Sequence, residues 1–196
     1  MCAALVLLMT PALAIFYGGM VRSKGVLNMI MMSFVSIGTV GVTWALVGYS
    51  EAFGNSLGGL IGNPFQFAFL DSLVTGDHAV GTVPGLAFVG FQATFAILAV
   101  ALLSGAIAER MTFRSWVVLS VLWVVLVYAP LAHWVFATDG LVSAHGGWIA
   151  NQLRAIDLAG GSVIEVACGS AGLALALVLG PRIGYGSVPM RPHNMT

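Results

Sequence analysis

Two carboxylates in the last third of the chain lie in an apolar stretch, where charge is rare. Asp157 and Glu165 are eight residues apart. In a helix this separation is about 12 Å, so Glu165 would lie near the middle of a bilayer if Asp157 lies at its edge. A carboxylate at that depth indicates a conducting path on which a proton or cation binds. The alternatives are a helix N-cap for Asp157 and a structural tie to a neighbouring helix for Glu165.

Small residues flank Glu165 along the same segment. They let the backbones of neighbouring membrane helices approach closely. We therefore expect Glu165 to be buried among close helices rather than exposed to lipid. The small residues are Gly160, Gly161, Ala167, Gly169, Ser170, Ala171 and Gly172.

Aromatic residues form a second group with possible chemistry. Phe91 and Phe95 are four residues apart, so they share one helix face, with Gln92 beside them. Aromatic faces attract desolvated cations by roughly 0.5–2 kcal/mol each, although core packing also explains such a pair. Trp134 and Phe136 lie near the end of another apolar stretch, where an interfacial aromatic belt is the alternative.

The composition shows which elements must hold these residues. The chain is 59% apolar and 7% charged, whereas an ordinary soluble domain is about 25% charged. Seven basic residues balance seven acidic ones, so there is no basic patch for nucleic acid. The sequence lacks the usual enzyme motifs, and its two cysteines and four histidines are dispersed. We predict an all-α integral membrane protein without enzyme activity, cofactor or metal.

Five apolar stretches are long enough to cross a bilayer. The first imitates a signal peptide, but its positive charges follow the apolar run instead of preceding it, which favours a retained span. With the N-terminus outside, six of the seven basic residues lie on the inner side and only Arg154 lies outside, as the positive-inside rule requires. The predicted spans are 1–20, 29–50, 84–108, 115–137 and 158–180.

An odd number of spans without an internal repeat is typical of one half of a transporter built from two halves of inverted topology. The segment from Pro181 to Thr196 is predicted to be an inner loop that leads elsewhere. We expect a truncated chain that has also lost the opening of its first helix.

Several short stretches follow one another along the chain in a characteristic order. They are Leu8-Met9-Thr10-Pro11, Phe16-Tyr17-Gly18-Gly19, Val26-Leu27-Asn28-Met29, Gly48-Tyr49-Ser50, Ala52-Phe53-Gly54, Phe91-Gln92 with Phe95, Gly105-Ala106-Ile107-Ala108-Glu109-Arg110, Ala132-His133-Trp134, Asp157 with Ala159-Gly160-Gly161, and Pro192-His193-Asn194. In this order they resemble the ammonium transporter family, the Amt/Mep/Rh group. The resemblance implies five transmembrane helices that form the first half of an eleven-helix inverted-repeat transporter, assembled as a homotrimer with one pore per subunit.

The resemblance also implies roles for single residues. Phe95 matches the family's pore-gating phenylalanine, Phe91 lines the same vestibule, and Asp157 matches the aspartate that shapes the outer ammonium-recruitment site. Phe136 stands where that site usually has a tryptophan, so a π face remains without the indole N–H. Trp134 is two positions away, about 200° around a helix, and should not replace it.

Glu165 stands where most members carry the first of two pore histidines, although some fungal-type members also carry glutamate there. Its negative charge predicts weaker discrimination between ammonium and other small cations. We predict inward ammonium transport in the plasma membrane, with ammonium and lipid as partners and a nitrogen-regulatory signalling protein at the cytoplasmic face. The alternatives are an ammonium sensor and a truncated remnant that conducts nothing.

Overall fold

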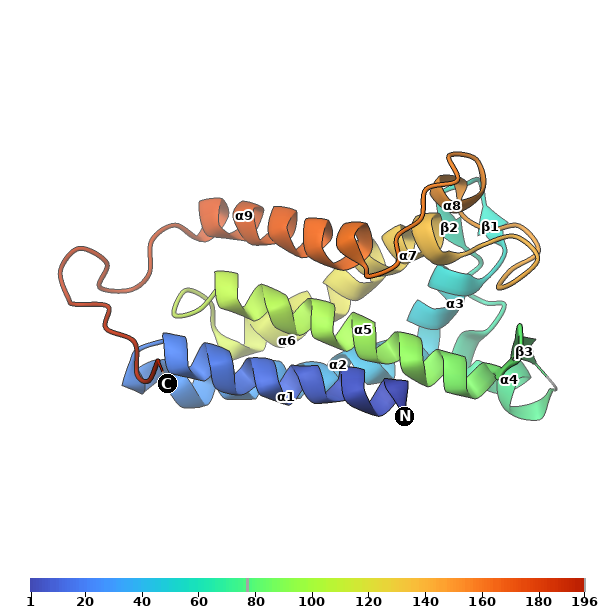
Figure 1. Ribbon diagram of the computed structural model, residues 1–196. Coiled ribbons are helices and arrows are strands. Elements are labelled where there is room, and N and C mark those ends of the chain that lie inside the picture. The colour runs from blue at the N-terminus through green and yellow to red at the C-terminus, as the bar shows by residue number, and fades with distance from the viewer. Residues whose placement is uncertain (77, 196) are drawn as a thin grey trace.

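The computed structural model describes residues 1–76 and 78–195. Five helical runs are long and apolar enough to cross a membrane, and in Figure 1 they lie side by side along one axis. This confirms the predicted all-α membrane class. The runs are α1 (Cys2–Met20); the 3₁₀ turn η1 (Ser23–Gly25) with α2 (Val26–Thr43), the π-helical turn η2 (Trp44–Gly48) and α3 (Tyr49–Phe53); α5 (Gly85–Ala106); α6 (Phe113–Trp123) with the π-helical turn η4 (Val124–Tyr128) and α7 (Ala129–Phe136); and the π-helical segment η5 (Gly161–Val166) with α9 (Ala167–Leu179).

The bounds of two runs differ from the predicted spans. The second run begins at Ser23 rather than at residue 29, and it continues to Phe53. Helix bounds follow backbone hydrogen bonds, whereas the prediction began after the charges, and a lysine in the first turn can extend its ammonium group away from the apolar region. The fifth run begins at Gly161 rather than at residue 158, because Gly160 before it has a left-handed backbone (φ 82°).

Helix α5 is the centre of the bundle, since it packs against α1, α2 and α9. Its contact with α1 is close at Gly105, where an added Cβ would lie 2.8 Å from Cζ of Tyr17. The hydroxyl of Tyr17 donates to the carbonyl of Leu102 on α5 (3.2 Å). A small residue therefore lets the two backbones approach until a side chain of one bonds to the other.

The two π-helical turns contact each other within the bundle. The indole of Trp44 in η2 lies edge-on to the ring of Tyr128 in η4, with ring centroids 6.0 Å apart. The same indole N–H donates to the carbonyl of Val89 on α5 (3.3 Å). These contacts fix α2 and the α6–α7 run at the same level against α5.

Short elements cover the end of the bundle where α3 and α7 finish (Figure 1). The segment before α5 links to the segment after α7 through the backbone N–H of Ser56, which donates to the carbonyl of His145 (2.7 Å). The side-chain oxygen of Asn55 accepts from the N–H of Ala144 (2.9 Å). The elements here are two antiparallel pairs, β1 (Ser56–Leu57) with β2 (Ile61–Gly62) and β3 (Ala79–Val80) with β4 (Val83–Pro84), together with η3 (Ala68–Leu70), α4 (Asp71–Thr75) and α8 (Trp148–Asn151).

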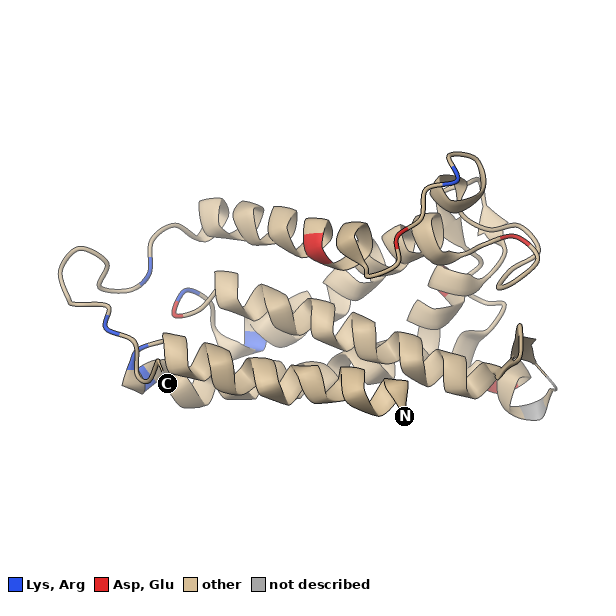
Figure 2. Ribbon diagram, in the orientation of Figure 1, with Lys and Arg blue, Asp and Glu red and all other residues tan. Residues whose placement is uncertain are grey.

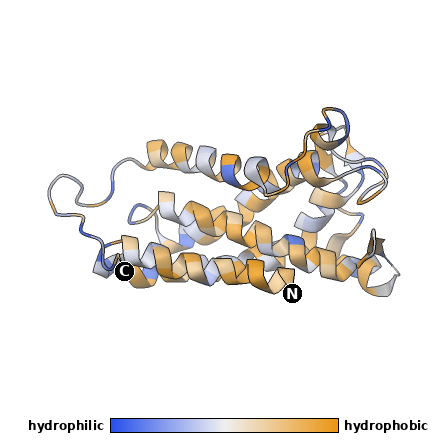
Figure 3. Ribbon diagram, viewed as in Figure 1, coloured by the Kyte–Doolittle hydropathy of each residue, from blue (hydrophilic) through white to orange (hydrophobic). Residues whose placement is uncertain are grey.

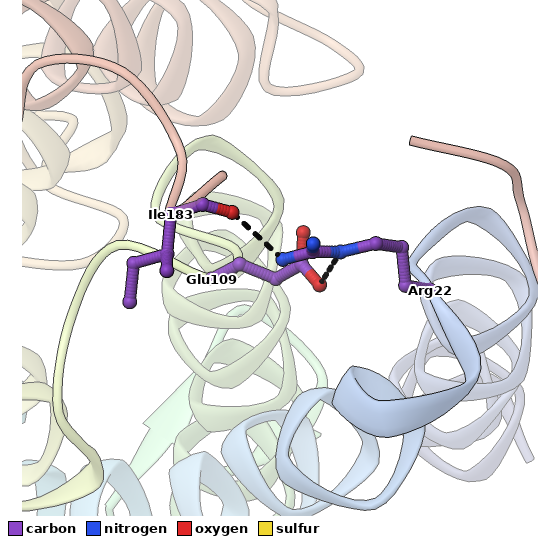
Figure 4. Close-up of polar contacts among 3 residues, drawn as sticks. All are labelled: Arg22, Glu109 and Ile183. Atoms are coloured by element: carbon purple, nitrogen blue, oxygen red, sulfur yellow. Dashed lines mark hydrogen bonds and ion pairs between the residues drawn. The ribbon is translucent and has the colours of Figure 1, made fainter. Parts of the chain in front are cut away.

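The opposite end carries most of the positive charge, as Figure 2 shows, while apolar residues dominate the helices between (Figure 3). Here Nε of Arg22 pairs with Oε1 of Glu109 at 2.7 Å. A second nitrogen of Arg22 donates to the carbonyl of Ile183 (3.0 Å), as Figure 4 shows. One guanidinium thus joins three segments: the α1–α2 connection, the end of the α5 region and the chain after α9.

Candidate functional site

A cavity of about 550 Å³ lies toward the end of the bundle that the short elements cover. Four of the five residues singled out from the sequence line it: Phe91, Phe95, Phe136 and Asp157. They come from α5, the end of α7 and the loop before η5, so three segments distant in sequence converge. Most of the other lining side chains are apolar. The cavity can therefore hold a small solute between aromatic faces and one carboxylate.

Phe91 and Phe95 pack against each other on α5, as their spacing predicted. Their ring centroids are 4.9 Å apart and the rings are nearly perpendicular, at 87°. Both side chains are half-buried, and Gln92 also lines the cavity. Because α5 begins at this end, Phe95 lies about 6 Å further along the helix than Phe91.

Phe136 is half-buried at the end of α7 and faces the cavity, whereas Trp134 is not among the described lining residues. The indole N–H of Trp134 donates to the carbonyl of Leu60 (2.6 Å), and its ring packs beside Trp148 with centroids 6.0 Å apart. Trp134 therefore holds the loops at this end of the bundle together instead of supplying a second π face to the cavity.

Asp157 caps the fifth helical run from four residues before it. Its Oδ1 accepts from the N–H of Gly161 (2.8 Å), and its Oδ2 accepts from the N–H groups of Ser162 (2.8 Å) and Val163 (3.3 Å) and from the Ser162 hydroxyl. These N–H groups belong to the first turn, where no helical carbonyl is available to them. The helix N-cap is Gly160 rather than Asp157, and Asp157 instead holds the first turn through its side chain from the preceding loop.

The cap sets the ionisation of this carboxylate. Partial burial tends to raise the pKa of Asp157, but the hydrogen bonds from Ser162, Val163 and Gly161 outweigh it and hold the pKa below its usual value. At neutral pH the cavity wall therefore carries one negative charge at this point. Asp157 also lies near the positive end of the helix dipole, which favours the same state.

Glu165 differs from its predicted surroundings, because its side chain is exposed. Helix α9 packs against α5 beside it, where the Cys168 thiol lies 3.1 Å from the Ala99 carbonyl. Glu165 is not on the described cavity lining, although the adjacent Ile164 is. Within this chain the expected burial of Glu165 is not met, because the other helices cover only part of the surface of its helix.

The small residues of α9 differ in whether they contact α5. An added Cβ at Gly172 would lie 3.3 Å from the Ala106 side chain, so this glycine serves the α5–α9 contact. An added Cβ at Gly169 would meet no atom within 4 Å. Close packing thus explains Gly172 and does not explain Gly169.

One lining residue was missed as a site residue. Arg154 lies on the cavity wall in the loop before Asp157, and its backbone is left-handed (φ 52°). One indication of this residue was available in the sequence, because Arg154 is the one basic residue predicted to lie on the outer side. Within residues 1–76 and 78–195 no ion pair joins Arg154 to Asp157, and no group of three or more His, Cys, Asp or Glu residues could hold a metal.

Comparison with known proteins agrees with this arrangement. The chain matches the family model described as Ammonium Transporter Family over residues 1–196. The chain belongs to the ammonium transporter family. This is a family of multi-pass membrane transporters rather than of enzymes.

Relatives within the ammonium transporter family are similar over almost the whole chain. An ammonium transporter of Mycobacterium tuberculosis is 53% identical, covering 98% of this chain and 44% of the relative. An ammonium transporter of Bacillus subtilis is 49% identical, and the match covers 99% of this chain and 45% of the relative. The crystal structure of Saccharomyces cerevisiae Mep2 matches with a TM-score of 0.82 at 29% identity, covering 98% of this chain and 42% of that one.

A structure titled Sensor Amt Protein matches with a TM-score of 0.86 at 30% identity, covering 99% of this chain and 47% of that chain. The chain thus spans less than half the length of these ammonium transporter relatives. The prediction of an N-terminal half is confirmed.

Proposed function

We propose that this chain takes part in moving ammonium across a membrane, through a pore that starts at the cavity described above. The observation that supports this most is the meeting of aromatic faces with a carboxylate in one mostly apolar cavity. A cation that loses part of its water is favoured by π faces and by a negative potential. The mostly apolar wall of the cavity favours neutral ammonia over the ammonium ion, so ammonium must lose a proton on the way.

The residues that line the cavity have different roles in ammonium passage, which follow from their positions. Phe136 and Phe91 offer π faces to the arriving cation. Asp157 acts through its field and by fixing the loop, because hydrogen bonds from the helix already occupy its oxygens. Phe95 lies further along α5 and limits passage towards the membrane centre.

Glu165 is proposed to bind a proton or cation on the path itself. Glu165 is adjacent to Ile164, which lines the cavity. A carboxylate attracts any small cation, so discrimination between ammonium and potassium should be weaker than with an imidazole. Glu165→His is expected to increase potassium exclusion and to shift the pH dependence of transport. Unchanged selectivity together with an unchanged pH profile would refute this role.

The orientation follows from the distribution of charge. Six of the seven basic residues belong to segments at one end of the bundle (Figure 2). By the positive-inside rule this end faces the cytoplasm, which puts the N-terminus and the cavity outside. We further propose a plasma-membrane homotrimer that moves ammonium inward and meets a nitrogen-regulatory signalling protein at its basic end.

The test is ammonium-evoked current in membranes that contain the protein as its own cells produce it. Asp157→Asn and Phe91→Ala should lower the apparent ammonium affinity, the latter by roughly 2- to 30-fold, which corresponds to a cation–π contribution of 0.5–2 kcal/mol. Phe34→Ala is the matched control, because Phe34 is 45% exposed on α2 and lies away from the cavity. Absence of ammonium-evoked current or uptake would overturn transport and favour the non-conducting alternative.

A second candidate is ammonium sensing, which the match to the Sensor Amt Protein favours. A sensor requires the same recruitment cavity but no flux. It would bind ammonium with the same dependence on Phe91 and Asp157 while conducting nothing. Ammonium binding without current would therefore select sensing over transport.

A further inference from the structure

The cavity of about 550 Å³ is lined by a second charged residue, which the proposed recruitment of ammonium does not use. Its lining residues all lie within the part of the chain that the structure describes, and they include two charged side chains, Asp157 and Arg154, among apolar and neutral ones. The other six basic residues lie toward the opposite end of the bundle (Figure 2). The cavity wall therefore carries one negative and one positive charge, which sum to zero.

The two charges differ in how the protein holds them. The oxygens of Asp157 accept hydrogen bonds from backbone N–H groups of Gly161, Ser162 and Val163, so this carboxylate is held against the start of the fifth helical run. The side chain of Arg154 is exposed, and it makes no hydrogen bond or ion pair with any residue that the structure describes. A guanidinium does not lose its proton in proteins, so this positive charge is permanent.

The backbone around Arg154 is held in a defined conformation. The N–H of Leu153 donates to the carbonyl of Trp148 (3.2 Å), and the N–H of Ala155 donates to that of Ile149 (3.2 Å). The Arg154 backbone between them is left-handed (φ 52°), which residues other than glycine adopt rarely. Such a conformation persists only where its surroundings determine it. The positive charge is thus attached at a defined point of the cavity wall.

A positive charge on this wall opposes the field of Asp157. A cavity with a net negative charge concentrates every small cation, because the attraction depends on charge and not on the kind of ion. In a neutral cavity this general attraction is largely cancelled, whereas the π faces of Phe91 and Phe136 remain. A π face attracts a cation most strongly once the cation has lost part of its water. The neutral wall therefore leaves selection to a step that differs between cations.

We propose that Arg154 is a specificity-determining residue, because its charge offsets that of Asp157 and the cavity then selects cations by their affinity for aromatic faces instead of by charge alone. This inference rests on the proposed recruitment of ammonium in the same cavity. Replacement of Arg154 by a neutral residue should strengthen the binding of every small cation, potassium included, and make that binding dependent on salt. An arginine that only solvates the surface would have neither effect.

The size of the effect follows from the width of the cavity. A unit charge about 10 Å from a mobile ion in water changes the local concentration of that ion about twofold, and a cavity of about 550 Å³ has roughly this width. A cation and an anion respond in opposite directions, so the ratio of their local concentrations changes about fourfold. At an ionic strength of about 1 M the Debye length is about 3 Å, and the change should disappear.

The test measures the charge of the cavity without requiring transport. Ala150→Cys places a thiol on the cavity wall, in a Cys2→Ser background that removes the exposed native thiol, while the native Cys168 is buried. The purified protein in a neutral detergent reacts with two thiosulfonate reagents of similar size, one with a trimethylammonium group and one with a sulfonate group. At low salt, Arg154→Gln should raise the ratio of the cationic to the anionic reaction rate about fourfold.

Two control variants separate charge from structure. Arg154→Lys keeps a positive charge at the same point, so its rate ratio should equal that of the wild type. Arg114→Gln makes the same change in net charge at an exposed arginine near the start of α6, at the opposite end of the bundle, and its rate ratio should also be unchanged. The increase in Arg154→Gln should vanish at about 1 M salt.

Ammonium itself is then measured in the same variants, by equilibrium binding and by evoked current. Arg154→Gln should bind ammonium and potassium each about twofold more tightly at low salt. Absence of both ammonium binding and current in the wild type would overturn the proposed function, while the rate ratio would still decide the charge of the cavity. Three results would overturn the role of Arg154: an unchanged ratio in Arg154→Gln, an Arg154→Lys variant that behaves like Arg154→Gln, or a changed ratio with unchanged ammonium binding.

Discussion

The cap at Asp157 gives the sharpest prediction, because its bonds can be removed in steps. Asp157→Ala leaves three backbone N–H groups and the Ser162 hydroxyl without their acceptor. Loss of an N-cap acceptor costs about 1 kcal/mol, with a range of roughly 0.5–2. The carboxylate here is charged and half-exposed, so water replaces part of what is lost. We therefore expect the free energy of unfolding to fall by about 1–2 kcal/mol.

Two milder variants should have a free energy of unfolding between that of Asp157→Ala and that of the wild type. Asp157→Asn keeps one acceptor oxygen but loses the charge, so about half of the effect is expected. Ser162→Ala removes a single side-chain bond and should cost about 0.5 kcal/mol. Arg154→Gln, in the same loop, alters net charge by one without touching the cap and should leave stability unchanged. Denaturant titration in mixed micelles, followed by tryptophan fluorescence, measures all four.

The pH dependence of this difference has a defined sign. The folded pKa of Asp157 is below its ordinary value of 3.8. A carboxyl with a lowered folded pKa contributes stability that is complete above the unfolded value and is lost as pH falls through the folded one. The gap between wild type and Asp157→Asn should therefore be constant from pH 7 to 5 and shrink below about pH 4. If Asp157→Ala is as stable as the wild type at pH 7, the stabilising role of the Asp157 hydrogen bonds is refuted.

Three further predictions concern packing and recruitment. Trp116→Phe, which removes a buried indole bond to a backbone carbonyl (2.8 Å), should lower the unfolding free energy by about 1–3 kcal/mol, and the more exposed Trp134→Phe by at most about 1 kcal/mol, in the same titration. Gly105→Ala should destabilise the chain by about 1–3 kcal/mol, because its Cβ would meet a ring of α1, whereas Gly38→Ala should not. Phe136→Trp should raise the apparent ammonium affinity in current measurements, because an indole is the strongest π partner for a cation; a lower affinity would mean that the larger ring blocks the cavity.

Much of this fold could be predicted from the sequence because length and hydropathy identify membrane helices. The Phe91–Phe95 contact could also be predicted, since a separation of four residues fixes it locally. Convergence of these rings with Phe136 and Asp157 was predicted through the resemblance and not from local pattern. It depends on how α5 and α7 pack.

The exposure of Glu165 could not be predicted in the same way. Its helix is apolar nearly all round, so periodicity does not indicate which face meets α5. Similarly, the π-helical turns leave no mark in the sequence, because the residues of Trp44–Gly48 and Val124–Tyr128 suit an α-helix equally well. Tertiary contacts decide both features.

A membrane span tolerates few changes in length, because one residue more or less turns every later side chain by about 100° around the helix axis. The turns η2 and η4 are exceptions, since a π-helical turn already accommodates one extra residue. Loss of a residue within Val124–Tyr128 can return the turn to an α-helix while Phe136 keeps its direction. These two turns are thus positions at which a lineage can shorten a span without moving the aromatic wall of the cavity.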